Sequence, residues 1–179
     1  MFHQDRENLL STGTIVMPGS AMSSQEKRMS ERIHYARVAP AGMKALAGVY
    51  NYVAQSGLAM ELIELIFLRV SEINGCAYCI DKHTKALHGA GLAWDKIVLT
   101  KVWREAGSWF TSRERAALAW AESLTLIART QAPDAVFAQV SAAFSDKEIA
   151  DMSIAIGLMN AWNRLAISHR KLPDSTPGN

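Results

Sequence analysis

The sequence predicts an all-α fold, a compact bundle of about six or seven helices. Apolar residues between about positions 31 and 172 recur at helical spacing, and strand-like alternation is almost absent. Two capping boxes, Thr111 with Glu114 and Ser145 with Glu148, mark helix starts. Gly, Pro and Asn residues interrupt the pattern at short intervals, so the connections are short. Short connections between helices favour one compact bundle.

The caps and breaks give the order of the elements. Pro40 suits the first turn of a helix, because its missing N–H is not needed there. Ser56-Gly57 and Asn74-Gly75 interrupt the apolar pattern and end helices. The expected helices cover about residues 40–55, 59–72, 76–89 (or to 91), 94–105, 111–129, 133–144 and 145–170.

The two ends of the chain differ from this pattern. Residues 1–30 are rich in Ser, Met, Gly and polar groups and predict a mobile leader, with Met22 and Met29 as alternative initiators. Residues 173–179 contain Pro, Gly and Ser and predict a flexible tail. The helical domain is therefore expected to span residues 31–172.

Composition excludes several classes of protein. Hydrophobic residues make up 49% and charged residues 20% of the chain, which allows a packed core and argues against global disorder. The net charge is +2 with both signs mixed, so we expect no nucleic-acid or anionic-membrane partner. No segment approaches the roughly 20 apolar residues of a membrane span. The N-terminus also makes a poor secretory signal, and we expect a cytoplasmic protein.

The chain has two cysteines, Cys76 and Cys79, only three positions apart. Such a pair cannot join distant parts of a fold, and in a reducing compartment it more often binds metal or does redox chemistry. No Gly-rich nucleotide loop follows a strand, so we expect neither NAD nor flavin nor another bound cofactor.

His83 completes a constellation with this pair. On a helix with Cys76 as origin, Cys79 falls at roughly −60° and His83 at roughly −20°, so all three share one sector. Because Asn74 and Gly75 end the preceding helix, both cysteines should occupy a first turn, where the helix dipole favours a thiolate. A nearby imidazole can accept the thiol proton. The arrangement suits reversible disulfide chemistry.

Glu64 interrupts the apolar run from Leu62 to Leu68. Its helical neighbours are Met60, Phe67, Leu68 and Ser71, so we expect a largely buried carboxyl group that can hold and pass a proton near neutral pH. The structural alternative is a core partner for a buried Arg or Lys.

Zinc is the main rival to redox chemistry. Cys76, Cys79 and His83 could supply three ligands, with Glu64 or His88 as the fourth. On an ideal helix His88 points about 140° away from His83, and the chain has no second Cys pair. We therefore expect no bound metal, and keep a zinc-stabilised helical interaction module as an alternative.

The spacing from Glu64 to Cys76-x-x-Cys79-x-x-x-His83 resembles the signature of AhpD-like alkylhydroperoxidases in the carboxymuconolactone decarboxylase superfamily. The resemblance covers about residues 40–129, and the segment Asn160-Ala-Trp-Asn-Arg164 is similar to the closing helix of these proteins. Those last residues could frame a site or a subunit contact, or simply stabilise the fold.

The resemblance implies a peroxidase that reduces hydroperoxides with a dithiol or protein thiol reductant. It implies that Cys79 is the peroxidatic cysteine, that Cys76 resolves it to a disulfide, and that Glu64 and His83 relay protons. The best-known AhpD proteins have a second histidine where this chain has Tyr78, which helical geometry directs away from the thiols. A general thiol–disulfide oxidoreductase is the alternative enzyme.

The resemblance also implies trimers or hexamers. Independently, a helix that is apolar around most of its circumference, such as residues 59–73, needs more cover than one small bundle easily gives. Both observations predict a homo-trimer or homo-hexamer.

Overall fold

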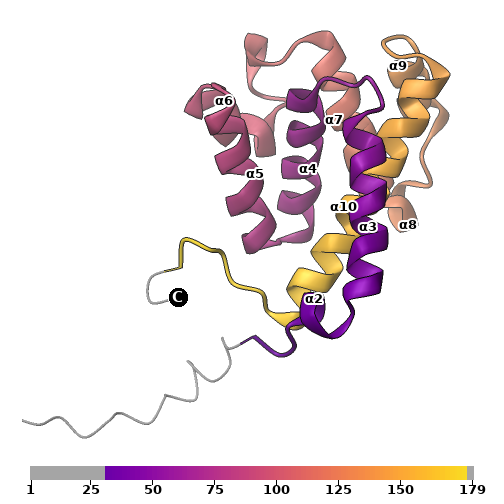
Figure 1. Ribbon diagram of the computed structural model, residues 1–179. Coiled ribbons are helices and arrows are strands. Elements are labelled where there is room, and N and C mark those ends of the chain that lie inside the picture. Colours follow the sequence, from indigo (N-terminus) through magenta and orange to yellow (C-terminus); the bar gives the residue numbers. More distant parts are fainter. Residues whose placement is uncertain (1–30, 177–179) are drawn as a thin grey trace, which may run out of the picture. The chain divides into compact units, whose positions relative to one another are not determined.

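The computed structural model describes residues 31–176. The predicted leader over residues 1–30, with its alternative initiators, and the last three residues of the predicted tail lie outside this range. The described residues contain helices and no strand, which confirms the all-α prediction. Their order, coloured along the chain in Figure 1, is α2 Tyr35–Val38, α3 Pro40–Ala54, α4 Met60–Asn74, α5 Ala77–Gly89, α6 Trp94–Leu99, η1 Thr100–Val102, η2 Gly107–Trp109, α7 Ser112–Thr125, α8 Ile127–Thr130, α9 Asp134–Ser141 and α10 Asp146–His169.

Both predicted capping boxes are present. The Thr111 hydroxyl accepts from the backbone N–H of Glu114, whose carboxylate accepts from the backbone N–H of Thr111 at 2.8 Å. Ser145 and Glu148 repeat the exchange at the start of α10, with the return bond at 2.9 Å. Each box satisfies two N–H groups that have no partner within the helix.

Two predicted helices are shorter than expected. The segment from Trp94 becomes a 3-10 turn at Thr100, whose hydroxyl donates back to the carbonyl of Lys96 at 3.1 Å. The helix that follows Thr111 ends at Thr125 and is continued by the single turn α8. There the hydroxyl of Thr130 donates to the carbonyl of Ser123 at 2.7 Å, a side-chain bond that competes with the regular helical pattern.

Helix α4 is the centre of the bundle. It packs against α5, α7 and α10, and Figure 1 shows α3 running along α10 beside it. Eight of its fifteen residues are buried, on all sides of the helix: Leu62, Ile63, Leu65, Ile66, Phe67, Leu68, Val70 and Ser71. The apolar circumference is therefore covered inside one subunit, and the argument for oligomerisation from this helix is wrong. Within residues 31–176, no helix combines the length and hydropathy needed to cross a bilayer.

Candidate active site

The site is built around the turn that joins α4 to α5. Gly75 ends α4 with φ 71°, a left-handed conformation that glycine adopts without the steric cost of a Cβ. The backbone N–H of Cys76 then donates to the carbonyl of Ser71 at 3.0 Å. Cys76 is the extended N-cap residue of α5, and Cys79 is the third residue of that helix. Both cysteines therefore lie at the start of α5, as expected, with Cys76 as its N-cap and Cys79 in its first turn.

The two thiol sulfurs are joined in a disulfide, with their Cα atoms 5.3 Å apart. Cys76 is 1% exposed and Cys79 is 4% exposed. The Cys76 sulfur also accepts from the backbone N–H of Cys79 at 3.4 Å, in the place of an N-cap oxygen. A thiolate formed at this helix start faces unpaired N–H groups and the positive end of the dipole.

His83 and Glu64 meet across α5 and α4. The Nδ1 atom of His83 lies 2.7 Å from the Oε2 atom of Glu64, and the imidazole ring packs 5.2 Å from the ring of Phe67. The His83 side chain is 3% exposed and that of Glu64 is 13% exposed. The predicted burial of Glu64 is thus only partly correct, and Met60, one of the neighbours expected to frame it, is itself exposed. The described partner of Glu64 is the imidazole of His83, and not a buried Arg or Lys.

An amide network fixes the turn before Cys76. The Asn74 amide donates to Oδ1 of Asn160 at 3.0 Å and to Oδ1 of Asn163 at 2.8 Å. Asn163, which is fully buried, donates in turn to the hydroxyl of Ser71 at 3.1 Å. The asparagines of α10, noted in the sequence without a settled role, therefore tie α10 to the end of α4 and hold the start of α5 in place.

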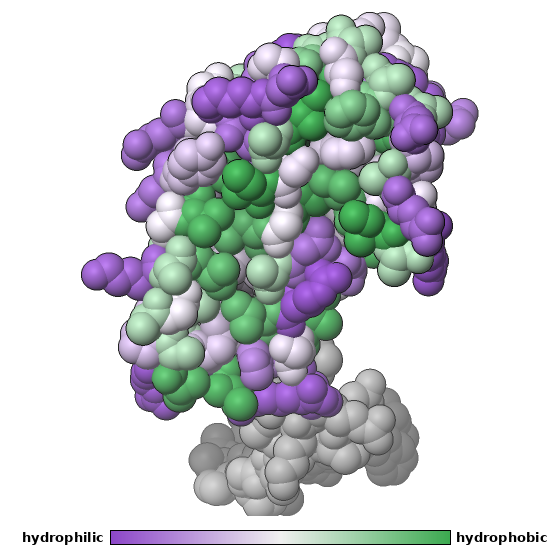
Figure 2. Space-filling view, turned by 90° about the vertical axis from the view of Figure 1, so that its right-hand side faces the viewer, coloured by the Kyte–Doolittle hydropathy of each residue, from purple (hydrophilic) through white to green (hydrophobic). Residues whose placement is uncertain are grey.

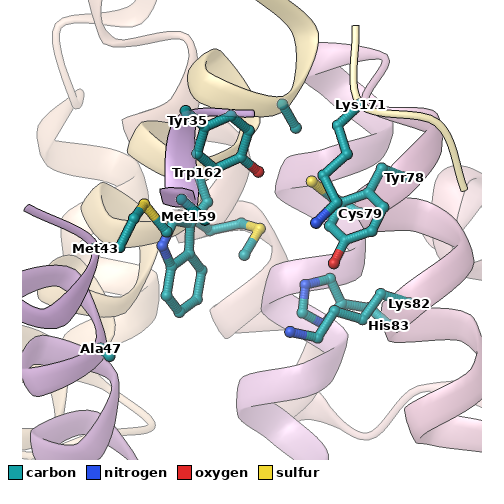
Figure 3. Close-up of a pocket in the computed structure, with 12 residues that line it drawn as sticks. Tyr35, Met43, Ala47, Tyr78, Cys79, Lys82, His83, Met159, Trp162 and Lys171 are labelled. Atoms are coloured by element: carbon teal, nitrogen blue, oxygen red, sulfur yellow. The ribbon is translucent and has the colours of Figure 1, made fainter. Parts of the chain in front are cut away.

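A pocket of about 180 Å³ opens beside Cys79 and His83, whereas Cys76 does not line it. The expectation that Tyr78 points away from the thiols is corrected, since its ring lines the same pocket. Figure 3 shows Met43, Met159 and Trp162 on one side, and Tyr78, Cys79, His83 and two lysines on the other. The full lining is Tyr35, Ala36, Met43, Ala47, Tyr78, Cys79, Lys82, His83, Met159, Trp162, Ala166 and Lys171.

Tyr35 and Lys171 were not predicted as site residues. They are far apart in the sequence and are brought together because the chain before α2 contacts the end of α10. The backbone N–H of Arg32 donates to the carbonyl of His169 at 2.9 Å, and the ring of Tyr35 lies 5.6 Å from that of His169. No local pattern in the sequence marks this contact.

The residues proposed for zinc are arranged differently from a metal site. Nowhere between residues 31 and 176 do three His, Cys, Asp or Glu side chains form a group that could hold a metal ion. His88 instead stacks on the ring of Trp94 with centroids 4.2 Å apart.

Residues 40–123 match the model of the carboxymuconolactone decarboxylase family, and this range contains both cysteines, His83 and Glu64. A solved structure from Agrobacterium tumefaciens superposes with a TM-score of 0.79 at 44% identity, covering 82% of this chain and all of that one. That protein is of unknown function and is described as a candidate antioxidant defence protein AhpD. The chain belongs to the AhpD-like carboxymuconolactone decarboxylase superfamily.

Two curated proteins show how far the similarity of this AhpD-like chain extends. It is 35% identical to the uncharacterized protein YdfG of Bacillus subtilis strain 168 over 140 residues, which cover 78% of this chain and 95% of YdfG. It is 43% identical to the alkyl hydroperoxide reductase AhpD of Rhizorhabdus wittichii over 47 residues, which cover 26% of this chain and 27% of that protein. The resemblance stated from the Glu, CxxC and His spacing is confirmed at the level of the family.

Proposed function

We propose that this protein is a thiol-dependent peroxidase that reduces hydroperoxides through Cys76 and Cys79. The observation that carries the proposal is the coincidence of three features at the start of α5. The disulfide-forming pair lies at the N-terminus of α5, and Cys79 of this pair borders a pocket. His83, which lines the same pocket, is hydrogen-bonded to Glu64. Its relatives described as AhpD support this chemistry.

The first half of the proposed cycle oxidises Cys79. Its thiolate attacks the terminal oxygen of the hydroperoxide, the O–O bond breaks, and the leaving alkoxide takes a proton to become an alcohol. We assign that proton to His83, which Glu64 orients and recharges through the 2.7 Å contact. Cys79 is left as a sulfenic acid. Cys79 has this role because it borders the pocket and Cys76 does not.

The second half restores the thiols. The Cys76 thiolate attacks the Cys79 sulfur, hydroxide leaves and is protonated to water, and the disulfide forms. An external dithiol or protein thiol then transfers two electrons and two protons to the pair and leaves as its own disulfide. A reducing cytoplasm would supply such a donor. The small pocket beside Cys79 is of a size for a small peroxide as the oxidant, and general thiol–disulfide exchange is the second candidate function for the same pair.

The test distinguishes the proposed roles of the two cysteines, attack on the peroxide by Cys79 and resolution by Cys76. We predict that Cys79→Ser abolishes peroxide consumption with a dithiol donor, because the attacking sulfur is gone. Cys76→Ser should allow at most one oxidation per chain and then stop, with a sulfenic acid that a dimedone-type trap detects by mass spectrometry. Normal turnover by Cys76→Ser would show that it is not the resolving thiol. Peroxide consumption by Cys79→Ser would overturn the proposed function.

A further inference from the structure

The pocket beside Cys79 has walls of two different kinds. Its apolar wall comes from α3 and α10, with Met43, Ala47, Met159 and Trp162. Facing it, as Figure 3 shows, the amino groups of Lys82 and Lys171 lie on the same side as Cys79 and His83. A cavity of this size holds a ligand of limited bulk, since an apolar cavity of about 150 Å³ accepts a single benzene ring.

The charge in the pocket is one-sided. No Asp or Glu is among the described residues that line it. Lys82 forms no ion pair within residues 31–176, and its amino group lies 5.9 Å from the ring centroid of Trp162. Three other described lysines, Lys85, Lys96 and Lys147, each have a carboxylate partner, as Lys85 has Asp81 at 2.8 Å. A cation that borders a cavity without a carboxylate partner is available to an anionic ligand.

Lys171 reaches the pocket from beyond the end of α10. Its amino group lies 4.1 Å from the ring centroid of Tyr78 and 5.9 Å from that of Tyr35. Burial alone would lower the pKa of Lys171, but a hydrogen bond to the Tyr78 hydroxyl and the charge of Asp174 raise it overall. Lys171 is therefore cationic at neutral pH, and the described residues place no carboxylate in an ion pair with it.

We infer that the hydroperoxide reduced at Cys79 is an anionic one, with a carboxylate that Lys82 and Lys171 bind and a compact apolar body that packs on Met159 and Trp162. The inference rests on the proposed peroxidase function and names its substrate class. It follows from geometry, because the lysines and Cys79 share one side of the cavity while the apolar residues line the other. The chemical step is the one given above, and the carboxylate takes no part in it.

A matched pair of substrates tests this inference. Cumene hydroperoxide is neutral, and its para-carboxylate derivative has the same ring and the same peroxide group. The fully reduced protein is mixed with each, and oxidation of the Cys pair is followed in a single turnover, which removes the external reductant from the measurement. We expect the carboxylate to react with at least about a 10-fold higher second-order rate constant, the effect of a hydrogen bond to a charged group.

The variants assign the preference to the pocket. In Lys82→Gln/Lys171→Gln the ratio of the two rate constants should collapse towards one. Lys85→Gln is the matched control, because Lys85 lies on the same helix, pairs with Asp81 and does not line the pocket. It should keep the wild-type ratio. A ratio near one in the wild type, or a ratio that the double variant keeps, would overturn the anionic-substrate inference while leaving the peroxidase intact.

An inert ligand gives a measurement that does not depend on folding of the variants. 4-Isopropylbenzoate lacks the peroxide and should compete with the hydroperoxide in the wild type, whereas the neutral 4-isopropylbenzamide should not. Equal inhibition by both compounds would contradict the role of the lysines. If neither hydroperoxide oxidised the reduced pair, the proposed peroxidase function itself would fail, which is a different result from the loss of charge preference.

Discussion

Glu64 is linked to the candidate site by its contact with His83, and we base its proposed role on this contact and not on its partial burial. Because Oε2 of Glu64 lies 2.7 Å from Nδ1 of His83, the carboxylate can hold the imidazole in one orientation and take up or return its proton. A glutamine at this position could still accept the hydrogen bond, but could not cycle the proton.

We therefore predict that Glu64→Gln slows single-turnover oxidation of Cys79 by tens-fold or more. A positioned acid–base group contributes about 10²- to 10⁴-fold, and water near the 13% exposed carboxyl can recover part of this. Glu61→Gln is the control, an exposed glutamate one turn earlier on α4. If Glu64→Gln lowered the melting temperature but kept the wild-type rate per folded molecule, the proton relay would be wrong.

Glu72 and Glu122 share one cationic partner, Arg69, but their pKa values shift in opposite directions. The Arg69 guanidinium pairs with Glu122 at 2.7 Å and with Glu72 at 3.2 Å. Burial of Glu122 is outweighed by bonds from Trp103, Arg104 and Arg69, and its pKa is lowered. For Glu72 burial dominates, and the weaker help from Arg69 leaves its pKa raised to about 7.

A pH dependence of stability follows. The folded state keeps Glu72 protonated up to about pH 7, whereas the unfolded chain releases that proton near the ordinary glutamate pKa of 4.5. The contribution of Glu72 is therefore favourable below pH 4.5, declines as the pH rises from there to about 7, and is lost above it. The loss is at most about 3.5 kcal/mol, at about 1.4 kcal/mol per pKa unit.

We predict that Glu72→Gln gains stability relative to the wild type as the pH rises from 4.5 to 7.5. Urea unfolding at several pH values gives the difference between the two free energies, which cancels the groups they share. Glu61→Gln, with an exposed carboxylate, should show no such trend. A Glu72→Gln difference that stays constant with pH would mean that this carboxyl group has the same pKa in the folded and the unfolded protein.

Among the elements, the two capping boxes are the clearest link from sequence to structure. Thr111→Ala removes the hydroxyl that accepts from Glu114, and we predict a loss of about 1 kcal/mol in the free energy of unfolding. Ser112→Ala, which changes an exposed hydroxyl at the first helical position, is the control and should have little effect. Equal losses from the two variants, measured in urea, would show that the cap contributes nothing specific.

The elements also show which parts of this protein can be predicted from its sequence. Helix starts at Pro40, Thr111 and Ser145 were predictable because capping depends on residues within one turn. The break at Leu126 was not, because it accompanies a hydrogen bond from the Thr130 side chain to the carbonyl of Ser123, on the other side of the break. The caps therefore depend on residues within one turn, whereas the break involves a side-chain bond between residues seven positions apart.

The same distinction applies to the site. Cys79 and His83 could be placed on one face because they belong to a single helix with a fixed period, and Cys76 is the N-cap of that helix. Glu64 could be singled out because it interrupts an apolar run, whereas its contact with His83 comes from the structure. Tyr35 and Lys171 could not be found, since only the docking of α2 against the end of α10 brings them to the pocket.

On the scale of the whole domain, the apolar surface left outside the core bears on assembly. Figure 2 shows apolar side chains spread over the face where α3, α8, α9 and α10 lie in Figure 1. Large side chains at least 36% exposed on these helices are Val49, Tyr52, Ile127, Phe137, Ile154 and Ile167. A face that exposes several large apolar side chains is a candidate interaction site. The predicted oligomer therefore has a different physical basis from helix α4, whose apolar residues are already covered.

We predict that the protein is a homo-trimer or homo-hexamer and that this face takes part in its interfaces. Ile127, 53% exposed on α8, is the substitution that tests it. Ile127→Glu should shift the assembly towards single chains, because an interface that buries an unpaired carboxylate is destabilised. Val98→Glu is the matched control, since Val98 is 59% exposed on α6, at the other side of the bundle in Figure 1. Light scattering at several concentrations measures both variants. A wild-type mass of one chain, 19.7 kDa, would exclude the oligomer, and an oligomer that Ile127→Glu leaves intact would place the interface elsewhere.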